Sequence, residues 1–146
     1  MKKAFFFLVL IFVINLPGLY YQWYLDFWWF DVILHFFGGL FIAMFFAEYL
    51  KENISIPLEA ARARSVPLLL TGRLKSTLVI IGATMFIGVV WEFAEYIANQ
   101  TLIEPFYRHF GVRAYFMGDL GDTVNDLTMD MLGAGLFAIL KVTRLR

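Results

Sequence analysis

Long apolar segments alternate with shorter polar ones along the chain, and this pattern predicts four membrane-spanning helices. The segments cover about residues 4–25, 29–50, 77–98 and 120–140. Each holds about 20 residues, which is what a helix rising about 1.5 Å per residue needs to cross a hydrocarbon core of about 30 Å. The sequence therefore predicts an all-α fold, a polytopic membrane helical bundle with four transmembrane helices that forms a single domain over residues 1–146.

The positions of the basic residues determine the predicted orientation. On one side of a four-span arrangement lie Lys2, Lys3, Lys51, Arg62, Arg64, Arg73, Lys75, Lys141, Arg144 and Arg146. Only Arg108 and Arg113 lie on the other side. Since lysine and arginine accumulate in cytoplasmic loops, we expect both termini and the loop over residues 51–76 to be cytoplasmic. The expected location is the plasma (inner) membrane, with a multi-pass topology.

The composition favours a membrane domain over a soluble one. Hydrophobic residues make up 61% of the chain and charged residues only 16%, and the mean hydropathy is +0.72. The formal net charge is zero, and the sequence carries no glycine-rich phosphate loop and no nucleic-acid signature, so we expect no nucleic-acid partner. The chain has no cysteine. Any bound metal must therefore use carboxylate, imidazole, amide or water ligands.

Seven carboxylates and one histidine lie inside or at the ends of the apolar segments, where packing alone does not favour them. They are Asp31, His35, Glu92, Glu95, Asp119, Asp122, Asp126 and Asp130. An ionised side chain near the middle of a membrane helix costs about 2.5 to 3.5 kcal/mol. A metal ion, shared protons, mutual hydrogen bonds or water in a cavity must compensate this cost, so the set predicts a functional polar centre.

These side chains are expected to meet inside the bundle at one depth. In the predicted topology the second, third and fourth segments all carry their acidic residues near the outer surface, and Asp130 lies about one turn deeper. Asp31 and His35 are i, i+4 neighbours, and Asp122, Asp126 and Asp130 form an i, i+4, i+8 stripe. Each pattern puts polar side chains on one face of an apolar helix. That face must point into the bundle, because lipid does not solvate it.

Each residue by itself also has a plainer structural interpretation. Asp31, Asp119 and Asp122 are compatible with negative charges favoured at a helix N-terminus. His35 is compatible with a hydrogen-bonded core histidine, and the glutamate pair of the third segment with a solvated helix end. The two deeper aspartates of the fourth segment lie too far into the membrane for a capping role, which favours a joint functional interpretation.

Carboxylates on facing helices together with one imidazole are the ligands that bundles use to bind one or two divalent cations. The candidate metal ligands are His35, Glu92, Glu95, Asp122 and Asp126. The catalytic candidates are His35 as a general base, Asp31 as the residue that orients it, and Asp130 as a bridging acid. Without a metal, crowded acids would share protons and provide general acids or a proton path.

Candidate substrate-binding residues lie in the predicted outer loop and at its end. They are Arg108, Arg113 and Asp119. The two arginines are suited to an anionic headgroup or a phosphate, although arginines in loops are also commonly just solvated.

The order of the polar residues resembles that of a known family. It reads Asp31-x-x-x-His35, then Trp91-Glu92-x-x-Glu95-Tyr96, then Gly121-Asp122-Thr123-x-x-Asp126-x-x-x-Asp130-x-x-Gly133-Ala134. It looks like that of the small inner-membrane proteins of the YjdF-like family and, more distantly, that of VanZ-like proteins. The resemblance covers the second, third and fourth segments, and the first segment adds nothing to it. Where VanZ-like sequences usually carry lysine, glutamine and asparagine, this chain has Val32, Glu95 and Asp130. The VanZ-like resemblance implies a link to envelope or lipid-linked precursors.

The sequence thus leads to an expected function with two alternatives. We expect an outward-facing carboxylate and histidine centre that binds a divalent cation and binds or acts on a lipid-linked or phosphate-bearing envelope substrate. The alternatives are a small cation- or proton-coupled transporter and a non-catalytic membrane assembly subunit. Membrane lipids are expected partners, and the sequence leaves open both homo-oligomerisation and whether the protein is an enzyme.

Overall fold

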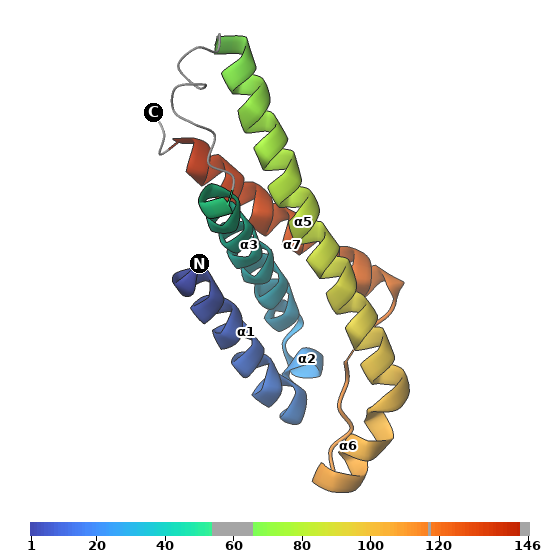
Figure 1. The fold of residues 1–146 in the computed structure, drawn as a ribbon. Helices are drawn as coiled ribbons and strands as arrows, with labels where there is room; N and C mark the ends of the chain where they lie inside the picture. Colours follow the sequence, from blue (N-terminus) through green and yellow to red (C-terminus); the bar gives the residue numbers. More distant parts are fainter. Residues whose placement is uncertain (54–65, 117, 144–146) are drawn as a thin grey trace.

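The computed structural model describes residues 1–53, 66–116 and 118–143, and all regular structure in these ranges is helical. The helices are α1 (Lys2–Tyr20), α2 (Trp23–Asp26), α3 (Trp28–Asn53), α5 (Val66–Thr101), α6 (Ile103–Phe110) and α7 (Leu120–Thr143). The long helices α1, α3, α5 and α7 form a bundle, and the short helices α2 and α6 lie at one end of it (Figure 1). The predicted all-α class is confirmed.

Within the described part of the chain, three helices are long and apolar enough to cross a membrane. Their apolar stretches are Lys2–Tyr20 in α1, Trp28–Leu50 in α3 and Leu74–Thr101 in α5. The helix α7 has 24 residues, about 36 Å at a rise of about 1.5 Å per residue, but its aspartates make it less apolar than the other three. The structure is therefore that of a helical membrane protein, and the fourth span stays a prediction.

The first helix ends earlier than the sequence pattern predicts. The segment predicted over residues 4–25 is divided into α1, which ends at Tyr20, and the separate four-residue helix α2. The cause is Gln22, whose backbone is left-handed, with φ of 59°. A left-handed residue does not continue a right-handed helix, so the chain turns here although the apolar and aromatic composition continues.

The loop predicted over residues 51–76 is also shorter than expected. The helix α3 continues to Asn53, and α5 begins at Val66. The apolar pattern marks where the hydrocarbon core ends, whereas a helix continues beyond it as long as its i to i−4 hydrogen bonds form. The basic residues Arg62 and Arg64 of this loop lie outside the described residues.

The helix α3 is the centre of the bundle, because it contacts α1, α5 and α7. Its closest neighbour is α7, and glycines allow this approach. A Cβ atom at Gly39 would collide with the backbone of Asp130, and one at Gly133 with the carbonyl oxygen of Phe36. Small residues let membrane helices approach closely. The close contact brings the aspartate-bearing face of α7 directly against α3.

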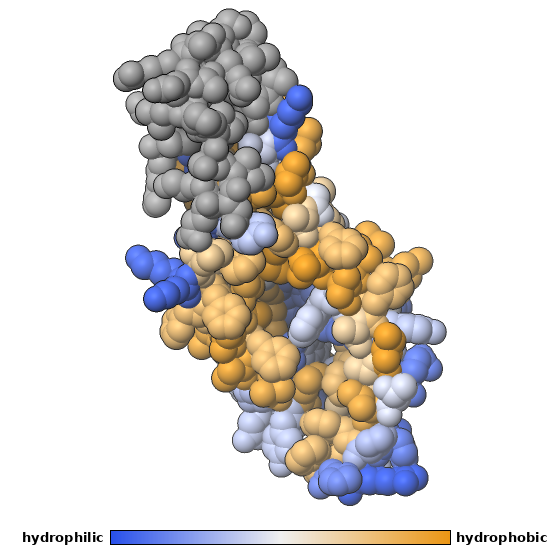
Figure 2. Space-filling model, in the orientation of Figure 1, coloured by the Kyte–Doolittle hydropathy of each residue, from blue (hydrophilic) through white to orange (hydrophobic). Residues whose placement is uncertain are grey.

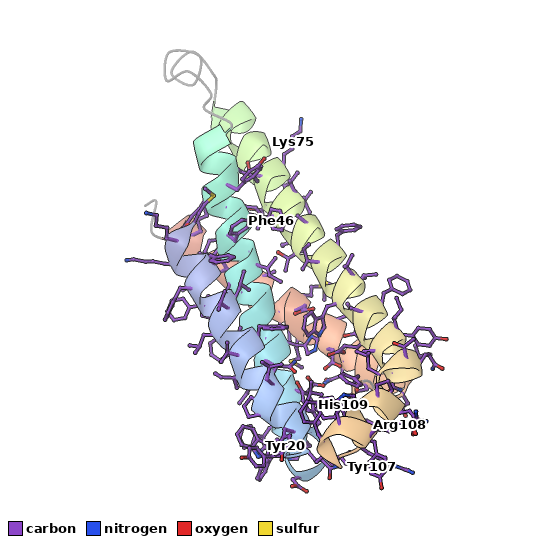
Figure 3. All side chains as sticks on the ribbon, turned by 60° about the horizontal axis from the view of Figure 1, so that its bottom comes forward. Tyr20, Phe46, Lys75, Tyr107, Arg108 and His109 are labelled. Atoms are coloured by element: carbon purple, nitrogen blue, oxygen red, sulfur yellow. The ribbon has the colours of Figure 1, made fainter. Side chains whose placement is uncertain are left out.

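The two ends of the bundle differ in character. At one end an apolar cluster fills the space between α3, α5 and α7; it consists of Ala43, Ala47, Ile80 and Ala134, with Phe46 and Phe137 packed against it. Lys75 lies at this end, which we call the Lys75 end, and Tyr107, Arg108 and His109 lie at the opposite end, which we call the α6 end (Figure 3). The buried polar residues of the long helices therefore lie in the half of the bundle toward the α6 end.

Aromatic contacts and a glycine cap organise the α6 end. The helix α6 ends at Gly111, whose φ of 69° favours glycine and lets the chain turn back. The ring of Phe106 contacts those of Phe110 and Phe116, with centroids 4.7 and 6.2 Å apart. The Gln22 amide donates a hydrogen bond to the carbonyl oxygen of Arg113 at 3.0 Å, which joins the α1–α2 turn to the segment before α7.

Candidate metal centre

The imidazole of His35 lies at the centre of the polar residues. It is 7% exposed and has a carboxylate on each side. Its Nε2 lies 3.5 Å from Oδ1 of Asp31, one turn earlier on α3, and its Nδ1 lies 3.6 Å from Oδ2 of Asp130 on α7. Each carboxylate is within ion-pair distance of one ring nitrogen, so together they fix the orientation of the ring.

The helix α7 supplies the two most deeply buried carboxylates. Asp126 is 1% exposed and Asp130 is 4% exposed. Both face α3, as the stripe of spacing four predicts. Asp130 has room there because α5 carries Gly88 opposite it: a Cβ atom at Gly88 would collide with Oδ2 of Asp130. Three helices thus shape the space around one aspartate.

The helix α5 adds two glutamates on the face toward α3 and α7. Glu92 is buried, with 7% exposure. Glu95 is half-buried, and its Oε1 accepts a hydrogen bond of 2.8 Å from the indole Nε1 of Trp91. This bond fixes the position of one carboxylate oxygen of Glu95.

Two sets of metal-ligating atoms share His35. One ligand atom from each of Asp31, His35 and Asp126 lies within 4.8 Å of the others. The same holds for the set formed by His35, Glu92 and Glu95. These are imidazole nitrogen and carboxylate oxygen ligands from different helices, the combination that suits divalent cations in a chain without cysteine.

Two of the buried carboxylates have an oxygen without a hydrogen-bond donor among the described residues. These atoms are Oδ1 of Asp126 and Oε1 of Glu92. A buried polar group without a partner costs about 1 to 3 kcal/mol, and more when it is charged. Each of the two atoms belongs to a residue of one ligand set. The donor chemistry and the unpaired oxygens therefore both fit a bound cation.

Two cavities meet at Asp31. The first, which we call the membrane-side cavity, has a volume of about 260 Å³, lies between α1, α3 and α5, and includes His35 and Asp130 in its wall. The second, the loop-side cavity, has a volume of about 310 Å³ and is lined by Tyr24, Asp119 and Asp122, among others. The polar centre is thus reached both from the helix faces and from the α6 end.

Tyr24 of α2 lines the loop-side cavity, and its hydroxyl oxygen is buried. Burial raises the pKa of Tyr24 above its usual range, and the nearby carboxylates of Asp31 and Glu95 raise it further. The hydroxyl oxygen has no hydrogen-bond partner in the described part of the chain. The hydroxyl therefore remains protonated and neutral.

The first two aspartates of α7 differ from the deeper pair. Oδ1 of Asp119 accepts hydrogen bonds from the backbone N–H groups of Gly121 at 2.7 Å and Asp122 at 3.1 Å, so Asp119 caps the helix. Oδ2 of Asp122 accepts one from Gly118 N–H at 3.0 Å. Asp122 lies beside Asp31 in the wall of the loop-side cavity and belongs to neither ligand set.

The two outer arginines are engaged with their own surroundings. Nε of Arg108 is 2.8 Å from Oε1 of Glu104 on the exposed side of α6. The guanidinium of Arg113 lies 5.7 Å from the ring centroid of Tyr107. Neither contact places an arginine among the residues of the two ligand sets.

Three residues contribute to the site beyond those predicted from the sequence. Asn15 is buried and lines the membrane-side cavity, so the first helix does contribute a polar group. Trp91 and Gly88 hold or accommodate a carboxylate each. An asparagine in an apolar helix was a visible signal, since polar residues there face the bundle interior. The fit of Gly88 to Asp130 depends on three-dimensional contact and has no signal in one sequence.

Long apolar helices that enclose buried carboxylates define the chain as a helical membrane protein. A family model described as "Predicted membrane protein (DUF2238)" matches residues 2–146, and the chain belongs to this family. No curated protein and no solved structure matches the sequence. The match establishes a family of membrane proteins and does not extend to the YjdF-like or VanZ-like groups.

Proposed function

We propose that this protein binds a divalent cation at a carboxylate and histidine centre within the membrane, and that the centre faces outward and binds or acts on a lipid-linked or phosphate-bearing envelope substrate. In this proposal Glu92, Glu95, Asp126 and His35 are metal ligands. Asp31, whose Oδ1 lies 3.5 Å from Nε2 of His35, orients the imidazole and leaves Nδ1 for the cation. Asp130, whose Oδ2 lies 3.6 Å from Nδ1, is a bridging acid beside the cation.

The observation that carries the proposal is the pair of unpaired carboxylate oxygens. Oδ1 of Asp126 and Oε1 of Glu92 are buried next to His35 without a donor among the described residues. A polar bundle interior with a purely structural role would supply hydrogen-bond donors to such atoms. A cation satisfies both at once and also offsets the repulsion between the acids.

The proposal includes a fourth span and an orientation. The acidic face of α7 packs against α3, while the exposed face carries large apolar side chains: Leu120, Val124, Met131, Leu132, Leu136, Ile139 and Leu140. This distribution supports α7 as a spanning helix, because the charges avoid lipid. The lysines and arginines near the Lys75 end support a cytoplasmic location of that end and of both termini.

A phosphate group is the substrate chemistry that such a centre suits best. A cation held by fixed carboxylates can coordinate a phosphate oxygen and neutralise its charge. The loop-side cavity, which Asp31 and Tyr24 line, gives the phosphate an approach from the α6 end.

The arrangement favours a binding or reacting centre over an ion-coupled carrier. A carrier needs access to its site from both sides of the membrane in turn. Here the loop-side cavity lies at the α6 end, the membrane-side cavity reaches from Asp31 to Ile42, and the apolar cluster around Ala43 and Ala134 fills the bundle toward the Lys75 end. A role in assembly alone does not account for the two buried carboxylate oxygens without a hydrogen-bond donor among the described residues.

Metal content measured on purified protein tests the proposal. Wild type, His35→Gln and the control Asp119→Asn are incubated with a mixture of divalent cations, freed of unbound metal and analysed by elemental mass spectrometry. We expect about one or two ions per chain in wild type and in the control, and a loss in His35→Gln, because His35 belongs to both ligand sets. Absence of metal from a monodisperse wild-type sample would overturn the proposal in favour of proton sharing among the acids.

A further inference from the structure

The membrane-side cavity is apolar over most of its length and is large enough for a hydrocarbon chain. Leu8 and Ile11 of α1, Ile42 of α3 and Ile87 of α5 line it. Its volume is about 260 Å³, and a dry apolar cavity of about 150 Å³ already binds a benzene-sized molecule. A polar group would lose its hydration in such a space, whereas a hydrocarbon chain gains from burial there.

The cavity opens on the side of the bundle that faces lipid. The helices α1 and α5 lie on either side of α3, and Figure 2 shows a hollow between apolar side chains on this face. Phe12 and Trp91 approach each other across the gap between α1 and α5, with ring centroids 6.5 Å apart. The exposed residues of these two helices include large apolar ones such as Phe86 and Val90 of α5, so a chain that enters here comes from the bilayer and not from water.

Polar residues line one end of the cavity and apolar residues line the other, in the same order as the headgroup and chains of a membrane lipid. Asn15, Asp31 and Trp91 line it toward the α6 end, and Leu8, Ile42 and Ile87 line it farther toward the middle of the bundle. This order follows from the helix directions, because α1 and α5 run toward the α6 end and α3 runs away from it. A lipid of the leaflet at the α6 end has the same polarity, with its headgroup near the surface and its chains directed to the midplane.

We infer that the membrane-side cavity holds one hydrocarbon chain of a phosphate-bearing lipid from the leaflet at the α6 end. The lipid enters sideways between α1 and α5, and its polar group lies against Asp31, His35 and Asp130. This inference rests on the proposed function and deepens it. It identifies the substrate as a membrane lipid, and it places the phosphate of that lipid at the cation bound by His35. The lipid chain sets the position of the phosphate by its depth in the cavity.

Photocrosslinking with a lipid probe tests the inference. The probe is phosphatidylglycerol with a diazirine in the middle of one acyl chain, added to the full chain in detergent micelles. Labelled peptides are identified by mass spectrometry in wild type, in Leu8→Trp and Ile11→Trp, which fill the cavity, and in Leu10→Trp. The last is a matched control, because Leu10 lies on the same helix, is exposed and does not line the cavity.

We expect labels in the α1 and α5 segments that line the cavity. Each cavity-filling variant should reduce this labelling about tenfold, which corresponds to losing the burial of about two methylene groups, and Leu10→Trp should leave it unchanged. Equal labelling in all four proteins would overturn the inference, because it would show lipid on the outer surface only. Using two cavity-filling variants guards against one of them failing to fold.

Metal content of the same samples separates this inference from the proposed function. Leu8 and Ile11 are not ligands, so the filled variants should keep the metal content of wild type while they lose the lipid label. A protein that binds metal but gives no cavity label contradicts only the lipid assignment. A protein that gives the label but binds no metal contradicts the metal centre and leaves the lipid cavity standing.

Discussion

Replacing Asp126 by asparagine separates a metal ligand from a structural polar residue. Asp126 is 1% exposed, and its Oδ1 has no hydrogen-bond donor among the described residues. Asparagine keeps the shape of the side chain, removes the charge and adds an N–H donor. The substitution therefore removes a cost when no cation is present and removes a ligand when one is present.

The expected magnitudes follow from the surroundings of the residue. The carboxylate is buried, and ligand atoms of His35 and Asp31 lie within 4.8 Å of it. Asparagine removes the buried charge and offers an N–H donor to the neighbouring carboxylates, so Asp126→Asn should raise the free energy of unfolding by about 1 to 3 kcal/mol in chelator. A cation at 100 times its Kd should stabilise wild type by about 2.7 kcal/mol, and a hundredfold loss of affinity should reduce this gain to about 0.4 kcal/mol in the variant.

Thermal unfolding in detergent, followed by tryptophan fluorescence with and without a divalent cation, measures both effects. At roughly 3 °C per kcal/mol for a chain of this length, the cation should raise the Tm of wild type by about 8 °C and that of Asp126→Asn by about 1 °C. Asp119→Asn is the control, because asparagine caps a helix as well as aspartate does, and it should respond like wild type. A cation-induced shift equal in wild type and in Asp126→Asn would refute the assignment of Asp126 as a ligand.

Two further predictions concern topology and helix packing. In a chain without cysteine, a membrane-impermeant thiol reagent on intact cells should label Arg108→Cys and spare Lys75→Cys, and the reverse pattern would contradict the proposed orientation. Gly133→Ala should lower the free energy of unfolding by about 1 to 3 kcal/mol, because the added methyl group meets the carbonyl oxygen of Phe36. Gly135→Ala, which meets nothing within 4 Å, should be neutral or stabilise the helix by up to about 1 kcal/mol, and equal destabilisation by both changes would argue against the close contact of α3 and α7.

The apolar pattern predicted the long helices well because hydrophobic length is a direct physical requirement of the membrane. The α3 and α7 helices begin within one residue of the predicted positions 29 and 120. The pattern failed where backbone geometry decides. The left-handed Gln22 divides the first predicted span, and the polar residues after Leu50 still continue α3 to Asn53.

The spacing of the acidic residues predicted which faces meet but not the role of each residue. The i, i+4 relation of Asp31 and His35 and the burial of Asp126 were both expected from helical periodicity. The same periodicity placed Asp122 on the stripe of Asp126, although its carboxylate accepts a hydrogen bond from Gly118 instead. Such differences depend on the loop before α7, whose course a helical pattern does not describe.

The position of a bound cation is the most direct test of the central claim. Crystals of the protein soaked with Zn²⁺ and measured at the zinc absorption edge give an anomalous difference map that locates the ion without reference to activity. We expect a peak within about 2.0 to 2.2 Å of an imidazole nitrogen of His35 and a carboxylate oxygen from α5 or α7. A peak only among exposed side chains at the α6 end, or no peak at a saturating concentration, would contradict the central claim.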